Sequence, residues 1–175
     1  MEQPAGNKIT GNPSSHPALS VKWVEDFPDI PLNRNEAYKL RVTSKGVEIE
    51  AITETGVYRA IQTLRQLTEK KGNGIAITGC EITDWPAFRI RGFMQDVGRT
   101  YISTDELKRE IAILARYKIN VFHWHLTENQ AWRLQSKVFP MLTDSVNTTR
   151  QPGKYYTLEE ARELAAFCKQ HHVLL

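Results

Sequence analysis

Two short stretches of the sequence place chemically capable side chains directly after apolar runs. The first, QDVGRTY at residues 95–101, carries Asp96 and Arg99. The second, VFHWHLTENQAWR at residues 121–133, carries two histidines and Glu128. In parallel α/β folds, functional groups collect where strands end and lead into helices. Both stretches are therefore candidates for one functional site.

His123 and His125 are the first candidates for metal chemistry. They alternate with Phe122 and Trp124, so both imidazoles should point to one face of a strand. Two neutral imidazoles that converge at a strand end can bind a catalytic metal. Alternatively, hydrogen bonds hold both rings inside a polar barrel interior, where they orient a carboxylate or the loop backbone. The histidine pattern leaves both interpretations open.

Arg99 also allows two interpretations. With Asp96 it can form a surface ion pair, which contributes little to stability. It can equally present a planar donor fork that holds the oxygens of a ligand in fixed geometry. Trp124 and Trp132 are expected in the core or in a pocket wall, although aromatic faces also support the C–H face of a sugar.

A β-hairpin followed by a helix is predicted for residues 38–67. Residues 38–43 and 47–52 alternate apolar and polar side chains, with Gly46 in the connection. Residues 55–67 change to the helical period. The residues on the apolar helix face are Val57, Ala60, Ile61, Leu64 and Leu67.

A small α+β domain is predicted for residues 20–86. Residues 70–74 end the helix, and residues 75–82 are apolar and β-branched enough for one or two short strands. A sheet covered by a helix on one face makes such a domain. Residues 1–19 are polar and rich in Gly, Pro, Ser and Asn, and we expect them to be a flexible lead-in.

From residue 87 onward the pattern is that of a parallel α/β fold. Strands are predicted at residues 90–97, 119–126 and 172–175. Capping boxes at Ser103–Glu106 and Thr157–Glu160 begin two helices. Their apolar stripes are Leu107, Ile111, Leu114 and Ala115, then Leu158, Ala161, Leu164, Ala165 and Cys168. The order β-α-β-α-β implies parallel strands with helical crossovers.

These elements do not complete a barrel. A closed eight-fold barrel takes about 250 residues, whereas three strands and two helices are predicted here. The last predicted strand is still apolar where the sequence stops at Leu175. We therefore expect residues 87–175 to be the first part of a truncated barrel, and the chain to be a fragment.

The composition excludes several classes of protein. With 41% hydrophobic and 25% charged residues, the chain is typical of a globular protein. Its net charge of +3 is scattered, which argues against a nucleic-acid partner or a polybasic membrane patch. No apolar run approaches the roughly 20 residues of a membrane helix, and the first residues show no signal-peptide pattern. Cys80 and Cys168 are predicted to be buried free thiols.

Longer stretches carry a more specific signal than any of these patterns. Residues 84–99 read DWPAFRIRGFMQDVGR and residues 117–126 read YKINVFHWHL. With QAWRL at 130–134 and FPMLT at 139–143, they closely resemble glycoside hydrolase family 20, the β-N-acetylhexosaminidases. EAYKL and GVYRAIQTLRQL, upstream, are similar to the small domain that precedes the barrel in these enzymes. The resemblance covers roughly residues 20–175.

This resemblance implies an exo-acting hydrolase that removes terminal β-linked N-acetylglucosamine or N-acetylgalactosamine from glycans. Its fold would be a small α+β domain followed by a (β/α)8 TIM barrel, of which this chain holds only the first strands and helices. The mechanism is retaining and substrate-assisted: the 2-acetamido oxygen of the sugar attacks the anomeric carbon. One enzyme carboxylate orients the acetamide, and an adjacent glutamic acid protonates the leaving oxygen. No metal or other cofactor is expected.

The resemblance also assigns residues. Arg99 takes the position of the arginine that binds hydroxyls of the terminal sugar. Glu128 stands where the family usually has the first of two aspartates, a carboxylate that helps to fix a histidine and the acid catalyst. Asn129 replaces the second aspartate and Ala131 a common glycine. Pocket support is expected from Glu128, His125, Asp96, Asn129 and Trp132.

The catalytic Asp-Glu pair of the family would lie past Leu175, so we expect no catalytic residue within this chain and no activity from it alone. Export to the periplasm, the cell exterior or a lysosome is expected from the family, with any signal lying upstream. The alternatives are a non-catalytic carbohydrate-binding module, or a metal-dependent barrel hydrolase that uses His123 and His125.

Overall fold

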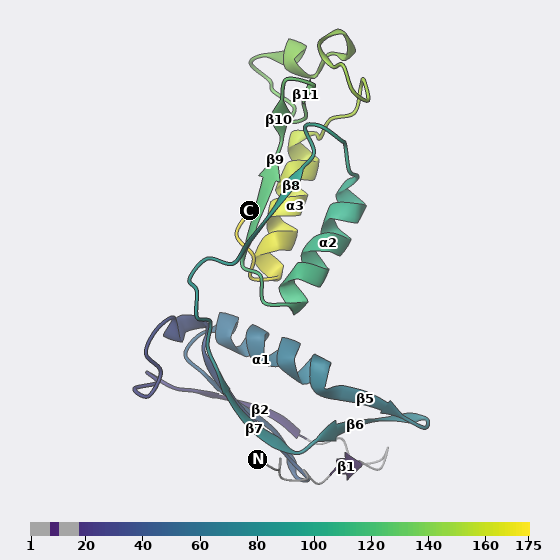
Figure 1. Cartoon of the computed structure of the whole chain (residues 1–175). Coiled ribbons are helices and arrows are strands. Elements are labelled where there is room, and N and C mark those ends of the chain that lie inside the picture. The colour runs from purple at the N-terminus through teal and green to yellow at the C-terminus, as the bar shows by residue number, and fades with distance from the viewer. Residues whose placement is uncertain (1–7, 11–17) are drawn as a thin grey trace. The chain divides into compact units, whose positions relative to one another are not determined.

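The computed structural model describes residues 8–10 and 18–175 of the chain. The chain divides into two compact units, Met1–Arg89 and Ile90–Leu175, and each is described by itself (Figure 1). The sequence predicts the boundary between residues 86 and 87, in the segment that follows the last strand of the first unit.

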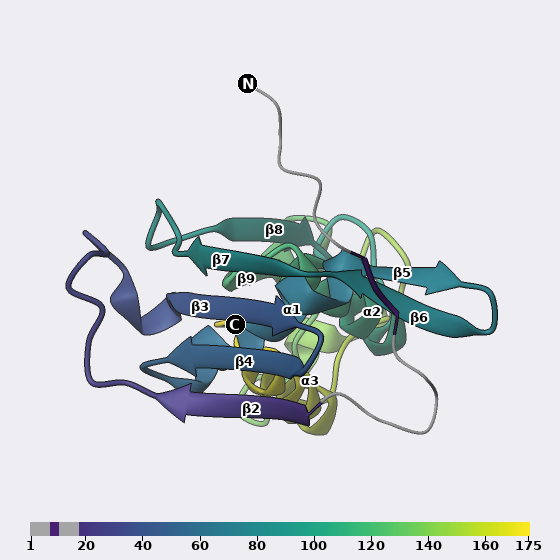
Figure 2. The same cartoon turned by 90° about the horizontal axis from the view of Figure 1, so that it is seen from below.

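A four-stranded sheet forms the centre of the first unit, with the strand order β2-β4-β3-β7 (Figure 2). The strands are β2 (Ala18–Trp23), β3 (Tyr38–Thr43), β4 (Gly46–Ala51) and β7 (Cys80–Asp84). β3 pairs antiparallel with both β4 and β7, which confirms the predicted hairpin, while β2 runs parallel to β4. No strand was predicted at the residues of β2.

Helix α1 (Glu54–Leu67) packs on one face of this sheet (Figure 1). Thr53 caps it, because its hydroxyl accepts a hydrogen bond from the Gly56 N–H at 3.3 Å. The predicted apolar face is confirmed: Ala60 is fully buried against the sheet, and its neighbours on that face are partly buried. The core residues of the sheet are Tyr38, Leu40, Val42, Val47, Ile49 and Ala51.

A second, three-stranded sheet has the order β1-β6-β5. The helix ends at Leu67, the last residue of the predicted helical period. Residues 70–74, predicted only to end the helix, instead lie in a hairpin in which β5 (Thr68–Lys71) pairs antiparallel with β6 (Gly74–Thr78). The connecting Gly72 has a φ of 58°, a left-handed conformation that favours glycine.

The expected flexible lead-in, residues 1–19, is only partly described. Residues 1–7 and 11–17 lie outside the described residues. Between them, β1 (Lys8–Thr10) pairs antiparallel with β6, and Ala18 and Leu19 begin β2. The flexible lead-in stays a prediction; within it, the described residues pair with β6 and β4.

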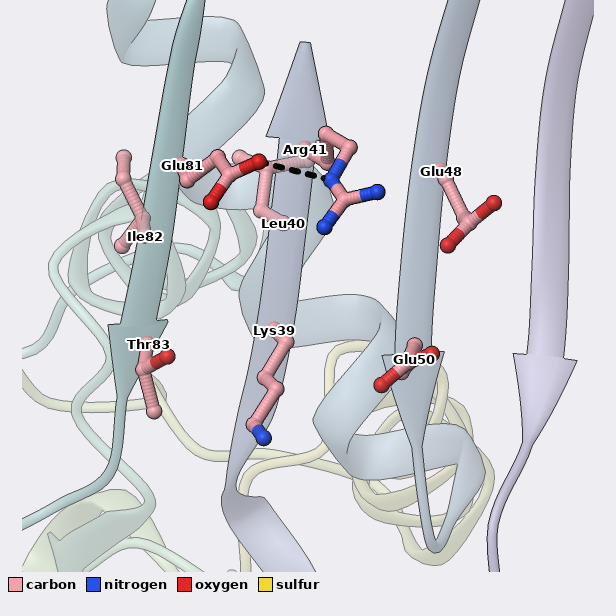
Figure 3. Close-up of a pocket in the computed structure, with 8 residues that line it drawn as sticks. All are labelled: Lys39, Leu40, Arg41, Glu48, Glu50, Glu81, Ile82 and Thr83. Atoms are coloured by element: carbon pink, nitrogen blue, oxygen red, sulfur yellow. Dashed lines mark ion pairs between the residues drawn. The ribbon is translucent and has the colours of Figure 1, made fainter.

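The sheet face away from α1 carries charges of alternating sign (Figure 3). Arg41 pairs with Glu81 at 2.8 Å, and Lys22 pairs with Glu50 at 2.6 Å. A groove on this face is lined by Lys39, Leu40, Arg41, Glu48, Glu50, Glu81, Ile82 and Thr83. The Arg41 and Glu81 side chains are 58% and 72% exposed, so this is the water-facing side of a sheet whose other side holds the core. Exposed pairs of this kind add little stability.

Two parallel strands and two α-helices make up the barrel part of the second unit. β8 (Gly92–Asp96) pairs parallel with β9 (Val121–His125). Helices α2 (Thr104–Arg116) and α3 (Leu158–Gln170) lie next to each other beside these strands (Figure 1). Both predicted capping boxes are present, each with the hydroxyl and the glutamate making their reciprocal backbone hydrogen bonds.

The helix stripes match the prediction except at one residue. Leu107, Ile111, Ala115, Leu164 and Cys168 are buried, while Leu114, Leu158 and Ala161 are half-buried. Ala165 is exposed, so the prediction is wrong there. It lies about 100° around the helix from Leu164, on the side of the stripe where Ala161 and Leu158 are only half-buried.

The third predicted strand is reduced to a single parallel bridge between Val121 and Leu174. The Phe122 N–H donates to the Leu174 carbonyl at 2.7 Å, and the Leu174 N–H donates to Asn120 at 2.8 Å. His172 has a φ of 52° and turns the chain between α3 and this bridge. The β-α-β-α-β order with parallel strands is therefore confirmed, in the form of a partial barrel.

Both cysteines are free, as predicted. Cys168 is buried on α3, and burial raises its pKa to about 11. Cys80 is half-buried on β7 rather than buried, and burial raises its pKa as well. Among the residues that the structure describes, no helix is both long and apolar enough to cross a membrane.

The core of the first unit gives a stability prediction. Ile49 is fully buried between the sheet and α1, so Ile49→Ala should lower the free energy of unfolding by about 2–5 kcal/mol. The matched control is Ile75→Ala on β6, where the side chain is 68% exposed and the change should stay within about 0.5 kcal/mol. Urea unfolding followed by circular dichroism measures both. Equal losses in the two variants would contradict the assigned core.

Candidate functional site

Asp96 and His125 lie opposite each other at the ends of β8 and β9. The parallel register pairs Asp96 with His125 and Met94 with His123, so these four side chains share one strand face. The opposite face carries Phe122, which is fully buried. The prediction that both histidines point to one face is confirmed, and their ring centroids are 5.6 Å apart.

Arg99 is held by two carboxylates. Its backbone N–H donates to Asp96 Oδ1 at 3.0 Å, and its Nη1 donates to Asp96 Oδ2. Its Nη2 pairs with Glu128 Oε1 at 2.9 Å. The Arg99 side chain is nevertheless 53% exposed, whereas those of Asp96 and Glu128 are 19% and 22% exposed. The two carboxylates are therefore largely shielded from solvent, while the guanidinium that they hold is accessible.

Glu128 also contacts the histidine. The same Oε1 atom that pairs with Arg99 lies 3.1 Å from His125 Nε2. Glu128 is held there by a short hairpin, in which β10 (Thr127–Glu128) pairs with β11 (Ala131–Trp132) and Glu128 faces Ala131. His125 thus contacts a neighbouring carboxylate, as the hydrogen-bonded interpretation of the histidine pair expects.

The charges of the site shift the pKa values of its members. Burial alone would raise the pKa of Asp96, but the hydrogen bonds and charge of Arg99 outweigh it and hold that pKa below its ordinary value. The pKa of Arg99 is raised, first by its hydrogen bond to Asp96 and then by the charge of Glu128. Asp96 and Arg99 are therefore both charged near neutral pH.

The turn between Asp96 and Arg99 is tied to the neighbouring strand. The N–H groups of Val97 and Gly98 both donate to the His125 carbonyl, at 3.0 and 3.2 Å. A Cβ atom at Gly98 would lie 3.0 Å from the Cβ of Glu128 and 3.1 Å from its backbone nitrogen. Glycine therefore allows the turn to pass directly against Glu128.

Asp96, His125 and Glu128 also have the geometry of a possible metal site. One ligand atom from each lies within 4.8 Å of the other two, and such a mixed set could bind a divalent ion. The two carboxylates, however, are already paired with Arg99. A metal ion would have to displace the guanidinium or accept a fixed positive charge beside it, so this donor set fits a metal poorly.

The tryptophans and Asn129 lie outside this charge cluster. Trp124 packs edge-on against Tyr156, with ring centroids 4.5 Å apart, and Tyr156 is fully buried. Trp124 therefore belongs to an aromatic core rather than to an exposed sugar-stacking floor. Trp132 is 39% exposed, and its indole N–H donates to the Leu134 carbonyl at 2.7 Å. Asn129 is exposed in the turn between β10 and β11.

Arg133 is a residue whose importance the sequence patterns missed. It is fully buried, and its guanidinium donates to the carbonyls of Val97 and Gly98, in the turn that precedes Arg99. In the sequence it is only one arginine of the QAWRL stretch. The one available signal was its place between Trp132 and Leu134, a charge within an apolar segment.

The lowered pKa of Asp96 can be tested. We expect its carboxyl group to titrate below the ordinary value of about 3.9. Because the folded-state pKa is depressed, the stabilisation from Asp96 is present above the unfolded-state pKa and is lost as the pH falls through the folded-state pKa. A carbon-13 NMR titration of the carboxyl group measures this value directly.

The Arg99→Gln variant removes the positive charge that lowers the pKa of Asp96, while the effect of burial, which raises it, remains. The pKa of Asp96 should therefore rise. Arg162→Gln, on the exposed side of α3, is the matched control and should leave it unchanged. An Asp96 titration that Arg99→Gln does not move would show that the ion pair is not formed in solution.

Two family models match the chain. Residues 4–85 match glycosyl hydrolase family 20, domain 2, and residues 88–175 match glycosyl hydrolase family 20, catalytic domain. Among curated relatives, the chain is 38% identical to a β-hexosaminidase of Porphyromonas gingivalis, over 98% of this chain and 22% of the relative. It is 36% identical to a β-N-acetylhexosaminidase of Cellulomonas fimi, over 84% of this chain and 30% of the relative.

Solved structures agree with these matches. The β-N-acetylhexosaminidase of Bacteroides fragilis superposes with a TM-score of 0.79 at 33% identity, over 89% of this chain and 32% of that one. The exo-β-N-acetylglucosaminidase of Vibrio harveyi in complex with N-acetylglucosamine gives a TM-score of 0.75 at 33% identity, over 89% and 26%. The chain thus spans about a third or less of these relatives. With both family models matched in order along the sequence, the chain belongs to glycosyl hydrolase family 20.

Proposed function

We propose that this chain provides part of the sugar pocket of an exo-β-N-acetylhexosaminidase. The enzyme would remove terminal β-linked N-acetylglucosamine or N-acetylgalactosamine from glycans by a retaining, substrate-assisted mechanism. Family membership supports the reaction class. The observation that carries the site assignment is an exposed guanidinium, that of Arg99, fixed by Asp96 and Glu128 at the ends of two parallel strands.

The arrangement of Arg99 suits a sugar. Each Nη nitrogen of a guanidinium carries two hydrogens, so Nη1 and Nη2 each keep one donor after pairing with Asp96 and Glu128. Two parallel donors on a rigid plane match two neighbouring oxygens, such as adjacent hydroxyls of a pyranose ring. The carboxylates fix the plane before the sugar binds, which reduces the entropy that is lost on binding.

Glu128 would link this sugar contact to the rest of the active site. Its Oε1 atom contacts both Arg99 and His125, so the position of the imidazole depends on the ion pair that holds the arginine. We propose that Glu128 and Asp96 position the groups that touch the sugar. His125 would contact a further polar group of the pocket. Asn129 and Trp132 would support the hairpin that carries Glu128.

The bond chemistry requires further groups. The 2-acetamido oxygen attacks the anomeric carbon, one carboxylate orients the acetamide, and a general acid gives its proton to the leaving oxygen. We assign the general acid and the orienting carboxylate to no residue of this chain, because Asp96 and Glu128 are both engaged with Arg99. The chain would therefore bind the sugar without cleaving the glycosidic bond.

We also propose an extracytoplasmic location and N-acetylhexosamine glycans, rather than nucleic acids, as partners. Support comes from the glycan substrates of hexosaminidases and from a net charge of only +3. A non-catalytic carbohydrate-binding module is the second candidate, since the Arg99 site alone offers binding without a general acid. The two tests below distinguish binding from turnover.

The first test measures turnover. We expect the 175-residue chain to release no 4-nitrophenol from 4-nitrophenyl N-acetyl-β-D-glucosaminide above the buffer rate, because a missing general acid alone slows such a reaction by about 10²–10⁴-fold. The Porphyromonas gingivalis relative is the positive control. Turnover by the chain at a rate similar to that enzyme would overturn the assignment of catalysis to other residues.

The second test measures binding. N-acetylglucosamine titrated into the nitrogen-15-labelled chain should shift the Arg99 side-chain resonance, and Arg99→Lys should weaken binding by about tenfold, since lysine cannot replace the two-point contact. Arg162→Lys, on the exposed side of α3, is the control that should bind as the unchanged chain does. Equal sugar affinity in the Arg99→Lys variant would remove the basis of the proposed site.

A further inference from the structure

Arg133 occupies a cage of backbone carbonyl groups. Its side chain is fully buried. Its Nε donates to the Val97 carbonyl at 3.0 Å, and its two Nη atoms donate to four more carbonyls at 2.7–3.3 Å. The carbonyls that accept these four bonds belong to Gly98, Arg150, Gln151 and Lys154. All five donors of the guanidinium are thus used.

This guanidinium is balanced by dipoles rather than by an opposite charge. Among residues 8–10 and 18–175, no carboxylate pairs with Arg133, and burial lowers its pKa. An unpaired cation is costly to bury. We take the role of this guanidinium to be that of holding the backbone in place, because its planar fork can bind carbonyls on several sides at once.

The cage joins segments that are far apart in the sequence. Val97 and Gly98 form the turn after β8, and residues 150–154 form the loop before α3. The main chain of Arg133 adds two more links: its N–H donates to Leu126 at 3.0 Å, and its carbonyl accepts from the Tyr156 N–H at 2.6 Å. One residue therefore holds the end of both strands and the loop beside them.

The turn held by this cage is the turn that presents Arg99. Val97 and Gly98 are the two residues between Asp96 and Arg99, and a Cβ at Gly98 would meet Glu128 at 3.0 Å. A shift of the turn would therefore change the distances from Arg99 to both of its carboxylates. A further link supports the same turn, since the Gln151 side chain accepts a hydrogen bond from the Tyr101 N–H at 2.6 Å.

We propose that Arg133 is a positioning residue of the sugar site: its carbonyl cage fixes the turn that presents Arg99 and so controls the affinity for the N-acetylhexosamine. The inference rests on the proposed function of Arg99. Arg133 does not touch the sugar, because it is fully buried. It acts through the Val97–Gly98 turn and through the loop at residues 150–154.

The test uses Arg133→Lys and Arg133→Gln in the 175-residue chain. A lysine ammonium is a point charge that cannot reach carbonyls on opposite sides of the cage. Glutamine removes the buried charge, so this second variant avoids burying an ammonium without its full set of partners. Arg162→Lys and Arg162→Gln, on the exposed side of α3, are the matched controls.

Two measurements separate positioning from general destabilisation. The first measurement is the amide hydrogen-exchange rate of Arg99 and Tyr101, whose N–H groups donate to Asp96 and Gln151. These rates are compared with those of amides inside α2 and α3. Titration with N-acetylglucosamine gives the dissociation constant. We expect exchange at Arg99 and Tyr101 to rise by about tenfold or more relative to the helices, and sugar affinity to fall by about fivefold or more.

The outcomes are distinct. Unchanged exchange at Arg99 and Tyr101 in both Arg133 variants, or exchange that rises equally in the helices, overturns the positioning role. So does loss of the fold in both variants, which would make the role a purely structural one. If Arg99→Lys weakens sugar binding and the Arg133 variants do not, this inference fails while the proposed function stands. If Arg99→Lys leaves binding unchanged, the proposed function fails, and with it the link from this cage to the sugar.

Discussion

The parallel register of β8 and β9 is the constraint on which the candidate site depends. It places Asp96 level with His125 and Met94 level with His123 on one strand face. Because side chains alternate along a strand, a shift of one residue would turn one member of each pair to the opposite face. Phe122, fully buried on that opposite face, opposes such a shift. The apolar packing of the second unit therefore also sets the geometry of its polar site.

The two central arginines show how environment assigns different tasks to one side chain. Arg99 is half exposed and paired with two carboxylates, so part of its guanidinium is open to solvent. Arg133 is buried and bonded to carbonyls through all five donors, so nothing remains for a ligand. The first can recognise oxygens and the second can hold backbone. The turn at Val97–Gly98 connects the two.

The sequence predicted what depends on local periodicity and capping. The hairpin before α1, both capping boxes and the common face of His123 and His125 follow from spacing within a few residues. Strand β2 was missed because its short alternation adjoins a polar segment. It lies at a sheet edge, where Leu19, Val21 and Trp23 are exposed. Ala165 was placed in the core because a period alone does not give the width of the buried stripe.

The site was less predictable because its contacts are not local. The resemblance grouped Asp96, Arg99, His125 and Glu128, but the sharing of one Glu128 oxygen between Arg99 and His125 depends on the β10–β11 hairpin. The Arg133 cage could not be predicted at all, because its acceptors are main-chain carbonyls, which every residue carries. Trp124 was left open between core and pocket wall, and only the position of Tyr156 decides for the core.

Three positions expected from the resemblance to depart from the family pattern, Glu128, Asn129 and Ala131, all belong to one hairpin. Glutamate at position 128 has a longer stem than aspartate, and its Oε1 atom contacts Arg99 and His125 together. Asn129 is exposed in the turn of this hairpin, and two carboxylates, Asp96 and Glu128, face the guanidinium of Arg99. Ala131, 2% exposed, is paired with Glu128 in the same hairpin.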